Sequence, residues 1–222
     1  MAVRTRSSRQ ARERELVRVT RTLFDERGVQ DAPVEEIARS AGIARGLVYR
    51  YFSSKEELYV ATMLEYLTEL DEAMATAVKD STGPVARLEA CSRSFAGYCH
   101  RYPAFLDSMM TLMKRPAAEL NESISPAVWI NLGQRMAACL EHVAAALRDG
   151  HAEGVIAAED PTGLANLLWA QAIGIMHLSR LGVGVRQTPE GNPSLFEIDA
   201  DRLEQACVEG AMALAQANVT LH

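Results

Sequence analysis

The chain has 222 residues, of which 48% are hydrophobic and only 6% are aromatic, so it can bury one sizeable core with a small module beside it. Ala, Leu, Met and Glu are plentiful and runs of β-branched residues are scarce, which favours an all-α fold over a sheet protein. The formal net charge of -6 would exclude a nucleic-acid partner only if it were spread evenly along the chain.

The charge is distributed unevenly. Residues 1–60 hold 12 Lys/Arg against 9 Asp/Glu, a balance of +3, and residues 61–222 hold 11 against 20, a balance of -9. Eight arginines fall within residues 1–27, where only four acids oppose them. A basic arm that leads into the first helix predicts an anionic polymer as partner.

The cysteines and the apolar runs indicate the compartment. Cys91, Cys99, Cys139 and Cys207 form no C-x-x-C pair, which favours buried, reduced thiols. No run approaches the roughly 18 apolar residues of a membrane span, and the arginine-rich start lacks the apolar stretch of a signal peptide. We therefore expect a cytoplasmic protein with no membrane association.

Three helices are predicted at the start of the chain. Apolar residues recur at helical spacing over 9–27, with Gly28 as the stop. Two short helices follow at about 33–41 and 44–51, separated by Gly42. Three helices within about 45 residues form a compact unit.

A long helix is predicted to begin at Ser53-Ser54-Lys55-Glu56-Glu57, which contains the S-x-x-E capping box in two overlapping registers. The helical pattern continues to Gly83-Pro84. We place the domain boundary at the start of this helix. It separates residues 1–53, which include the basic arm, from residues 54–222.

Proline and glycine divide the remainder of the chain. Their positions predict further helices, which bring the total to about nine. These helices lie near 84–100, 104–114, 126–149, 161–181 and 199–217. The stretch 183–198 is interpreted as a surface loop joining the last two helices.

The segment GVQDAPVEEIARSAGIARGLVYRYFSSKEEL, residues 28–58, resembles the tetracycline-repressor (TetR) family of bacterial regulators. The resemblance rests on Leu23-Phe24, Ile37-Ala38, Ala41-Gly42, the stretch 46–52 and the Lys-Glu-Glu-Leu sequence that starts the long helix. It implies that residues 1–53 form a helix-turn-helix DNA-binding domain and residues 54–222 an effector-binding and dimerisation domain. The implied contacts with double-stranded DNA are Arg45, Gly46, Tyr49, Tyr51 and Lys55.

The residue types suit that role. A helix fits the major groove, and small residues at its start allow close approach to base edges and phosphates. Arg45 and Arg50 can bond guanine or phosphate, the tyrosines can bond phosphate or pack on thymine methyls, and Lys55 can grip a phosphate at a helix N-terminus. The alternative is that the aromatic residues pack a small core, and this is our interpretation for Phe52.

Two residues depart from the family pattern. Pro33 and Ala44 stand where a hydroxyl residue usually begins the second and third helices, so a cap and a phosphate contact are lost at each position. Asp31 could cap the second helix instead.

The body of the chain is rich in Met and aromatic residues. Most of these are expected in the core, but the resemblance implies a pocket for a small, lipophilic effector. The residues chosen for its lining are Phe95, Met109, Trp129, Met136 and Trp169. His100, His142 and His177 lack metal-ligand spacing and a recognisable carboxylate partner, and no catalytic constellation is present, so we expect no metal, no cofactor and no enzyme activity.

The last two helices carry small residues among leucines. These small residues either pack a monomeric core or, as the resemblance implies, pair with a second copy of the chain in a homodimer. The resemblance then implies a repressor that binds a palindromic operator and is released by its effector. The small residues are Ala170, Gly174, Ala206, Gly210, Ala211 and Ala213. Two other functions stay open, a helical small-molecule-binding enzyme or carrier and an architectural DNA-binding dimer without an effector.

Overall fold

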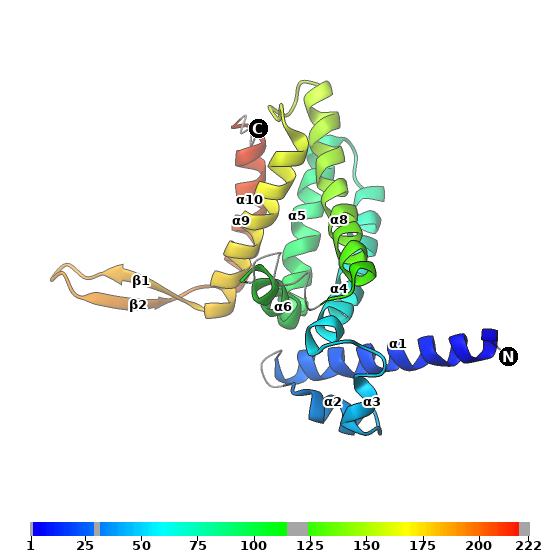
Figure 1. The fold of residues 1–222 in the computed structure, drawn as a ribbon. Coiled ribbons are helices and arrows are strands. Elements are labelled where there is room, and N and C mark those ends of the chain that lie inside the picture. Colours follow the sequence, from blue (N-terminus) through cyan, green and yellow to red (C-terminus); the bar gives the residue numbers. More distant parts are fainter. Residues whose placement is uncertain (1, 29–31, 115–123, 218–222) are drawn as a thin grey trace. The chain divides into compact units, whose positions relative to one another are not determined.

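The computed structural model describes residues 2–28, 32–114 and 124–217, apart from the side chains of residues 2–7 and of residue 113. These residues form nine helices and one two-stranded sheet (Figure 1). The helices are α1 (Ala2–Arg27), α2 (Val34–Ser40), α3 (Arg45–Val48), α4 (Lys55–Lys79), α5 (Pro84–Arg101), α6 (Pro103–Met113), α8 (Pro126–Ala152), α9 (Pro161–Leu181) and α10 (Ala200–Ala215). The all-α prediction is confirmed, and none of the helices in the described ranges is long and apolar enough to cross a membrane.

Prolines mark where most of the later helices begin. Pro84, Pro103, Pro126 and Pro161 each occupy the first helical position, where the missing N–H is tolerated. The predicted helix positions in this part of the chain are therefore confirmed to within a few residues. The main difference is at the N-terminus, because α1 already begins at Ala2 and includes the basic segment predicted as an arm.

The structure divides into two compact units, of which unit 1 comprises Met1–Thr68 and Tyr102–Arg135. In unit 1 the fully buried Tyr66 of α4 donates a hydrogen bond to the Asp25 carboxylate of α1 at 2.6 Å. The Arg21 guanidinium lies 4.4 Å from the Tyr66 ring centroid, and Phe105 of α6 packs against the same ring. The aromatic core thus joins α1, α4 and α6.

The N-terminus of α4 is closed by a capping network. The Ser54 hydroxyl accepts a hydrogen bond from the Glu57 N–H at 2.9 Å, which confirms one of the two predicted registers. The Glu57 carboxylate in turn accepts bonds from the Ser53 N–H and from the hydroxyl of Ser125, which directly precedes α8, each at 2.5 Å. Burial raises the pKa of the Glu57 carboxyl, but the bonds from Ser125 and Ser53 outweigh it and lower the pKa below its usual value.

Unit 2 comprises Glu69–Arg101 and Met136–His222. Here α10 packs against α9 and α5, and their apolar faces enclose a core around Leu88, Leu147 and Leu164 (Figure 1). His142 of α8 lies 2.7 Å from the Asp71 carboxylate of α4. The expectation that the histidines lack a carboxylate partner is wrong for His142, because its partner is 71 residues away in sequence and no helical spacing indicates it.

The interpretation of 183–198 as a loop is wrong. The strands β1 (Val183–Gln187) and β2 (Pro193–Glu197) form an antiparallel hairpin in which Val185 pairs with Leu195. The glycines and prolines of this stretch lie mostly in and beside the turn, and they obscured the alternating Val183 and Val185 that favour a strand.

Candidate nucleic-acid interface and internal cavity

A tight turn joins α2 to α3. Gly42 adopts a φ of 65°, a left-handed conformation that a side chain would strain, and its N–H bonds to the Arg39 carbonyl at 3.1 Å. The next residue, Ile43, donates its N–H to the Ala38 carbonyl at 2.9 Å. These bonds set the direction in which α3 leaves α2.

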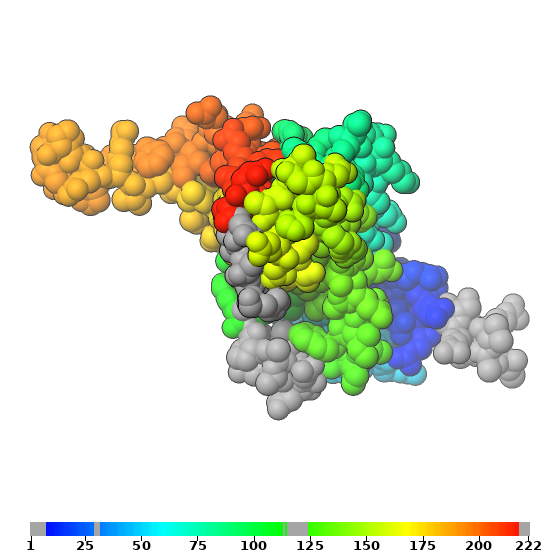
Figure 2. All heavy atoms as spheres, turned by 90° about the horizontal axis from the view of Figure 1, so that it is seen from above, coloured from blue at the N-terminus to red at the C-terminus, as the bar shows by residue number. Residues whose placement is uncertain are grey.

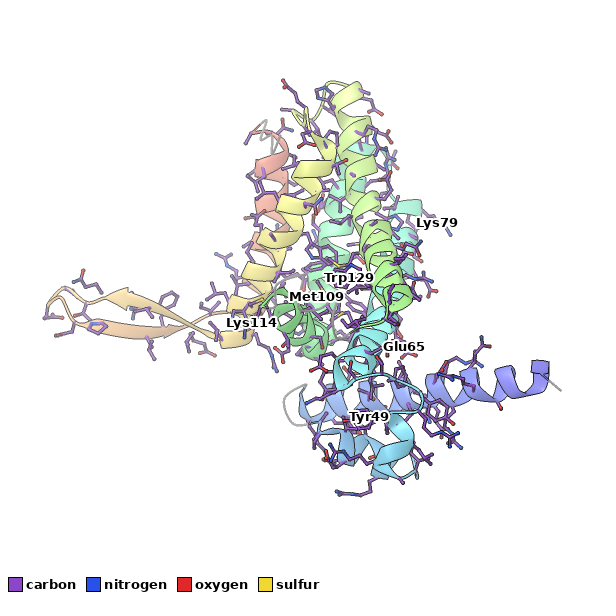
Figure 3. All side chains as sticks on the ribbon, in the orientation of Figure 1. Tyr49, Glu65, Lys79, Met109, Lys114 and Trp129 are labelled. Carbon is purple, nitrogen blue, oxygen red and sulfur yellow. The ribbon has the colours of Figure 1, made fainter. Side chains whose placement is uncertain are left out.

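Helix α3 has one buried face and one exposed face. Val48 and Phe52 are buried at a spacing of four residues, which anchors the helix on unit 1. Arg45, Gly46 and Arg50 lie on the surface. Tyr49, labelled in Figure 3, is 41% exposed. A Cβ added at Gly46 would meet no atom within 4 Å, so the backbone here is open to an approaching partner.

The starts of α2 and α3 lack side-chain caps. Pro33 and Ala44 occupy the N-cap positions, and neither makes a side-chain capping bond. This agrees with the two departures noted from the sequence. Asp31, the alternative cap for α2, lies outside the described residues.

Arg45 is held by its neighbours. Its guanidinium lies 2.8 Å from the Glu35 carboxylate of α2 and 5.9 Å from the centroid of the Tyr49 ring. The hydrogen bond with Tyr49, followed by the charge of Glu35, raises the pKa of Arg45. Arg45 is therefore a permanently charged, partly oriented group, and Glu35 is a functional neighbour that the sequence analysis missed.

Lys55 is the first residue of α4 and is exposed. Its Nζ lies 4.9 Å from the ring centroid of Tyr59, whose hydroxyl donates to the Ala32 carbonyl at 2.6 Å. A cation at the positive end of a helix is electrostatically unfavourable unless an anion joins it. The arrangement therefore favours an anion such as phosphate at this point.

The two remaining candidates differ in exposure. Arg50 is exposed and forms no ion pair within the described ranges, whereas Tyr51 is half-buried. Arg9 of α1 forms an ion pair with Glu13 on its own helix at 2.8 Å, and this hydrogen bond and charge raise the pKa of Arg9.

Two short helices joined by a tight turn, the second presenting cations and a tyrosine to solvent, define a helix-turn-helix protein. Residues 16–62 match the sequence profile of the bacterial regulatory proteins of the tetR family. The N-terminal part of the chain is thus similar to the DNA-binding domain of the TetR family, in agreement with the resemblance seen in the sequence.

One curated relative is HTH-type transcriptional regulator BetI 2 of Chromohalobacter salexigens, with 41% identity over 64 residues. That match covers 29% of this chain and 31% of the relative, so the chain spans about a third of the length of such relatives.

Solved structures extend the likeness in fold to most of the chain. FadR from Bacillus subtilis, in complex with stearoyl-CoA, has a TM-score of 0.64 at 15% identity, over 90% of this chain and 97% of that one. RolR, in complex with resorcinol, has a TM-score of 0.63 at 16% identity, over 96% of this chain and 97% of that one. At these identities the likeness establishes the fold alone.

The residues chosen for an effector pocket are only partly brought together. Phe95 and Trp169 of unit 2 lie with ring centroids 4.8 Å apart and line a cavity of about 30 Å³. Its lining does not include Met109, Trp129 or Met136. Met109 is buried on α6 and Trp129 is half-buried on the first turns of α8, both in unit 1 (Figure 3).

The cavity wall is almost entirely apolar. Burial raises the pKa of the Cys91 thiol to about 12 and that of Cys207 to about 11, so both lining cysteines stay protonated at neutral pH. The polar atom that stands out is Nε1 of Trp169, which is buried and has no hydrogen-bond partner in the described part of the chain. Within the same residues, no group of three His, Cys, Asp or Glu side chains could hold a metal ion.

Proposed function

We propose that the protein is a DNA-binding transcriptional regulator that reads its operator through α3 and the start of α4. The observation that carries the proposal is the joint exposure of Arg45, Tyr49, Arg50 and Lys55 on the basic part of the chain. Two further features support it, the open backbone at Gly46 and the family of the domain.

Each group has a distinct part in this proposal. Arg45 bonds a guanine or a phosphate, and Tyr49 bonds a phosphate or packs on a thymine methyl. Lys55 and the N–H groups at the start of α4 bind a phosphate and fix the register of the head on the duplex. Arg50 and the half-buried Tyr51 add backbone contacts.

The test is a fluorescence-anisotropy titration of the chain's own promoter DNA at moderate salt. Arg45→Ala and Tyr49→Ala are each expected to weaken binding roughly ten- to a hundredfold. The matched control is Arg148→Ala, because Arg148 is also exposed and also ion-paired to a glutamate, Glu141, but lies on α8. Unchanged binding of the two head variants, or equal weakening by the control, contradicts the proposal.

We further propose that the chain acts as a homodimer through α9 and α10. The small residues of these helices divide into two groups. A Cβ at Gly210 would come within 2.3 Å of the Gln171 amide, and Ala211 is buried, so both serve contacts within the chain. Ala170 and Gly174 are exposed, with nothing near Gly174, and are available to a second copy.

The exposed face of α9 supports a dimer because it carries no charge from Thr162 to Leu178, and the one exposed charged side chain of the helix is Arg180 in its last turn. Interface cores are depleted of charged residues, whereas a solvated helix face normally contains them. The residues that form this face follow one another at helical spacing and are Thr162, Asn166, Ala170, Gly174, Leu178 and Leu181. A two-fold dimer carries two heads and requires a palindromic operator, so a binding-site selection from random DNA that returns single half-sites contradicts it.

The cavity between Phe95 and Trp169 is our candidate effector site. It is far smaller than the roughly 300 Å³ of a typical ligand pocket, so an effector must be small or must open the bundle. The apolar wall and the unpartnered Trp169 Nε1–H favour a neutral, lipophilic molecule with one hydrogen-bond acceptor. A ligand that prefers the conformation with lower operator affinity releases the DNA by linkage.

A thermal-shift screen with phenols and methyl ketones tests this site, since a ligand at about 100 times its Kd stabilises the folded chain by about 2.7 kcal/mol. Trp169→Phe keeps the ring but removes the N–H, and is expected to reduce the shift. Trp129→Phe, the other tryptophan, is the matched control and should leave it unchanged. No shift with any compound favours an architectural protein, and turnover of a bound compound favours an enzyme.

A further inference from the structure

The β1–β2 hairpin has two unlike faces. Residues that pair directly across the ribbon share a face, so Val183, Val185 and Leu195 lie together on one side, with Glu197 at its start and Gln187 and Pro193 at its far end. Val185 is 71% exposed and Leu195 is 67% exposed, so these side chains have little cover in the described structure. Val183, Val185 and Leu195 therefore form a bare apolar surface between Glu197 and Gln187, and we call this side of the ribbon the valine face.

On the opposite face of the hairpin, an aromatic ring covers the backbone of the neighbouring strand. The Phe196 ring lies over Gly184, where an added Cβ would come within 2.4 Å of the ring. The Arg186 guanidinium lies 5.9 Å from the centroid of the same ring, and Ser194 completes this side. The aromatic ring thus packs on the ribbon itself, which leaves the valine face as the side that lacks a partner.

A two-stranded hairpin with nothing packed on it has only marginal stability. An isolated hairpin is at best barely stable in water and needs a third strand or another packed element. Its two unpaired strand edges are also exposed to other chains. Figure 2 shows the hairpin as an arm that extends away from α9 and α10, so these helices do not cover its outer part.

The charge of the hairpin excludes two kinds of partner. Residues 183–197 carry one arginine against two glutamates, a balance of -1. Nucleic acids and anionic membranes bind basic surfaces, so neither suits this arm. Its apolar face fits another protein surface.

The valine face follows directly on the exposed apolar end of α9, which also carries Arg180. The apolar residues of that end are Leu178 and Leu181, both exposed, and Val183 begins β1 two residues later. Both views show the hairpin projecting on the side of unit 2 where α9 and α10 lie (Figures 1 and 2). A second copy docked on α9 would therefore meet the arm as well.

We propose that the valine face of the hairpin packs against a second copy of this chain and extends the dimer interface beyond α9 and α10. This inference rests on the dimer of the proposed function. The hairpin then acts as an arm that each subunit lays on its partner, and the partner supplies the cover that an isolated ribbon lacks.

The test compares two neighbouring substitutions by sedimentation over a dilution series. Leu195→Asp places a charge on the valine face, and Ser194→Asp places the same charge on the opposite face of the same strand. We expect Leu195→Asp to raise the dimer dissociation constant about tenfold or more, and Ser194→Asp to change it by less than about twofold. Replacement of residues 184–196 by a Gly-Ser linker should match Leu195→Asp, whether or not the variant hairpin folds.

Equal dissociation constants for wild type, Leu195→Asp and the linker variant overturn the inference, and mean that the face serves a different protein or none. Gly174→Arg separates this outcome from failure of the dimer itself. If Gly174→Arg gives monomers while the linker variant stays dimeric, the dimer through α9 and α10 is supported and the contribution of the hairpin to it is contradicted. A wild-type chain that is monomeric at all concentrations overturns both.

Discussion

The helix-turn-helix head and the β1–β2 hairpin both expose large side chains, but they do so in different chemical settings. In the head, the exposed Arg45 is held by Glu35 and Tyr49, and Lys55 lies over Tyr59. On the hairpin, Val185 and Leu195 are exposed without charge or support. The charged side chains of the head are held in place by their neighbours, which suits a rigid charged ligand such as DNA. The exposed apolar side chains of the hairpin suit a protein partner that buries them.

The first prediction, with the largest expected effect, concerns the buried side chains that anchor the helix-turn-helix head. Ile37→Ala removes a fully buried side chain of α2 and is expected to lower the free energy of unfolding by about 2–5 kcal/mol. Leu47→Ala, at an exposed position of α3, should change it by less than about 0.5 kcal/mol. Urea denaturation followed by circular dichroism measures both, and a similar cost for the two would mean that the head is not anchored as described.

The second prediction concerns Lys55. Lys55→Ala is expected to weaken DNA binding about tenfold and to reduce the slope of log K against log salt by about 0.9 for each head. Lys79→Ala, at the other end of the same helix, is the control and should leave the slope unchanged. A salt slope that does not change in Lys55→Ala would remove the phosphate contact from the proposal.

The third prediction concerns the capping network, a polar support that the hairpin lacks. Because the folded-state pKa of Glu57 is lowered, its contribution to stability is present above the unfolded pKa and is lost as the pH falls through the folded value. Glu57→Gln should cost about 1 kcal/mol at neutral pH, and the difference from wild type should shrink in acid. Glu56→Gln removes the same charge from the same turn and serves as the control in urea titrations at several pH values. A difference that grows in acid contradicts the account.

The prediction with the smallest expected effect asks whether the ion pair with Glu35 makes Arg45 less available to DNA. Glu35→Gln removes the ion pair without removing Arg45, and is expected to raise affinity for DNA about two- to fivefold, the range of an exposed ion pair. Glu36→Gln breaks the pair with Arg27 instead and should leave affinity as it was. Weaker binding in Glu35→Gln would show that orientation of Arg45 matters more than its release.

Local signals predicted most of the fold. Prolines at 84, 103, 126 and 161 and the Ser54–Glu57 capping box act within one helical turn, and the structure has the helices where these signals place them. The hairpin was missed because its strands are short and its turn is long, so the turn residues dominated the pattern.

The site was predicted less completely, for a physical reason. The exposed positions of α3 follow from which residues of a short helix are buried. The sequence indicates Phe52 as buried but leaves Leu47 or Val48 open, and the structure buries Val48. The pair of Glu35 with Arg45 depends on how two helices cross, which helical spacing does not encode. The cavity depends likewise on tertiary packing, so Phe95 and Trp169 were placed in one group with side chains that do not line it.

The burial of the cysteines has a practical consequence. All four are buried, and burial raises the pKa of the thiols of Cys91, Cys99 and Cys207. The native chain should therefore react slowly with maleimides, and Val185→Cys would offer a single fast site on the hairpin. In the proposed dimer, a fluorophore or spin label attached there would report the distance between the two hairpins with and without the proposed operator DNA.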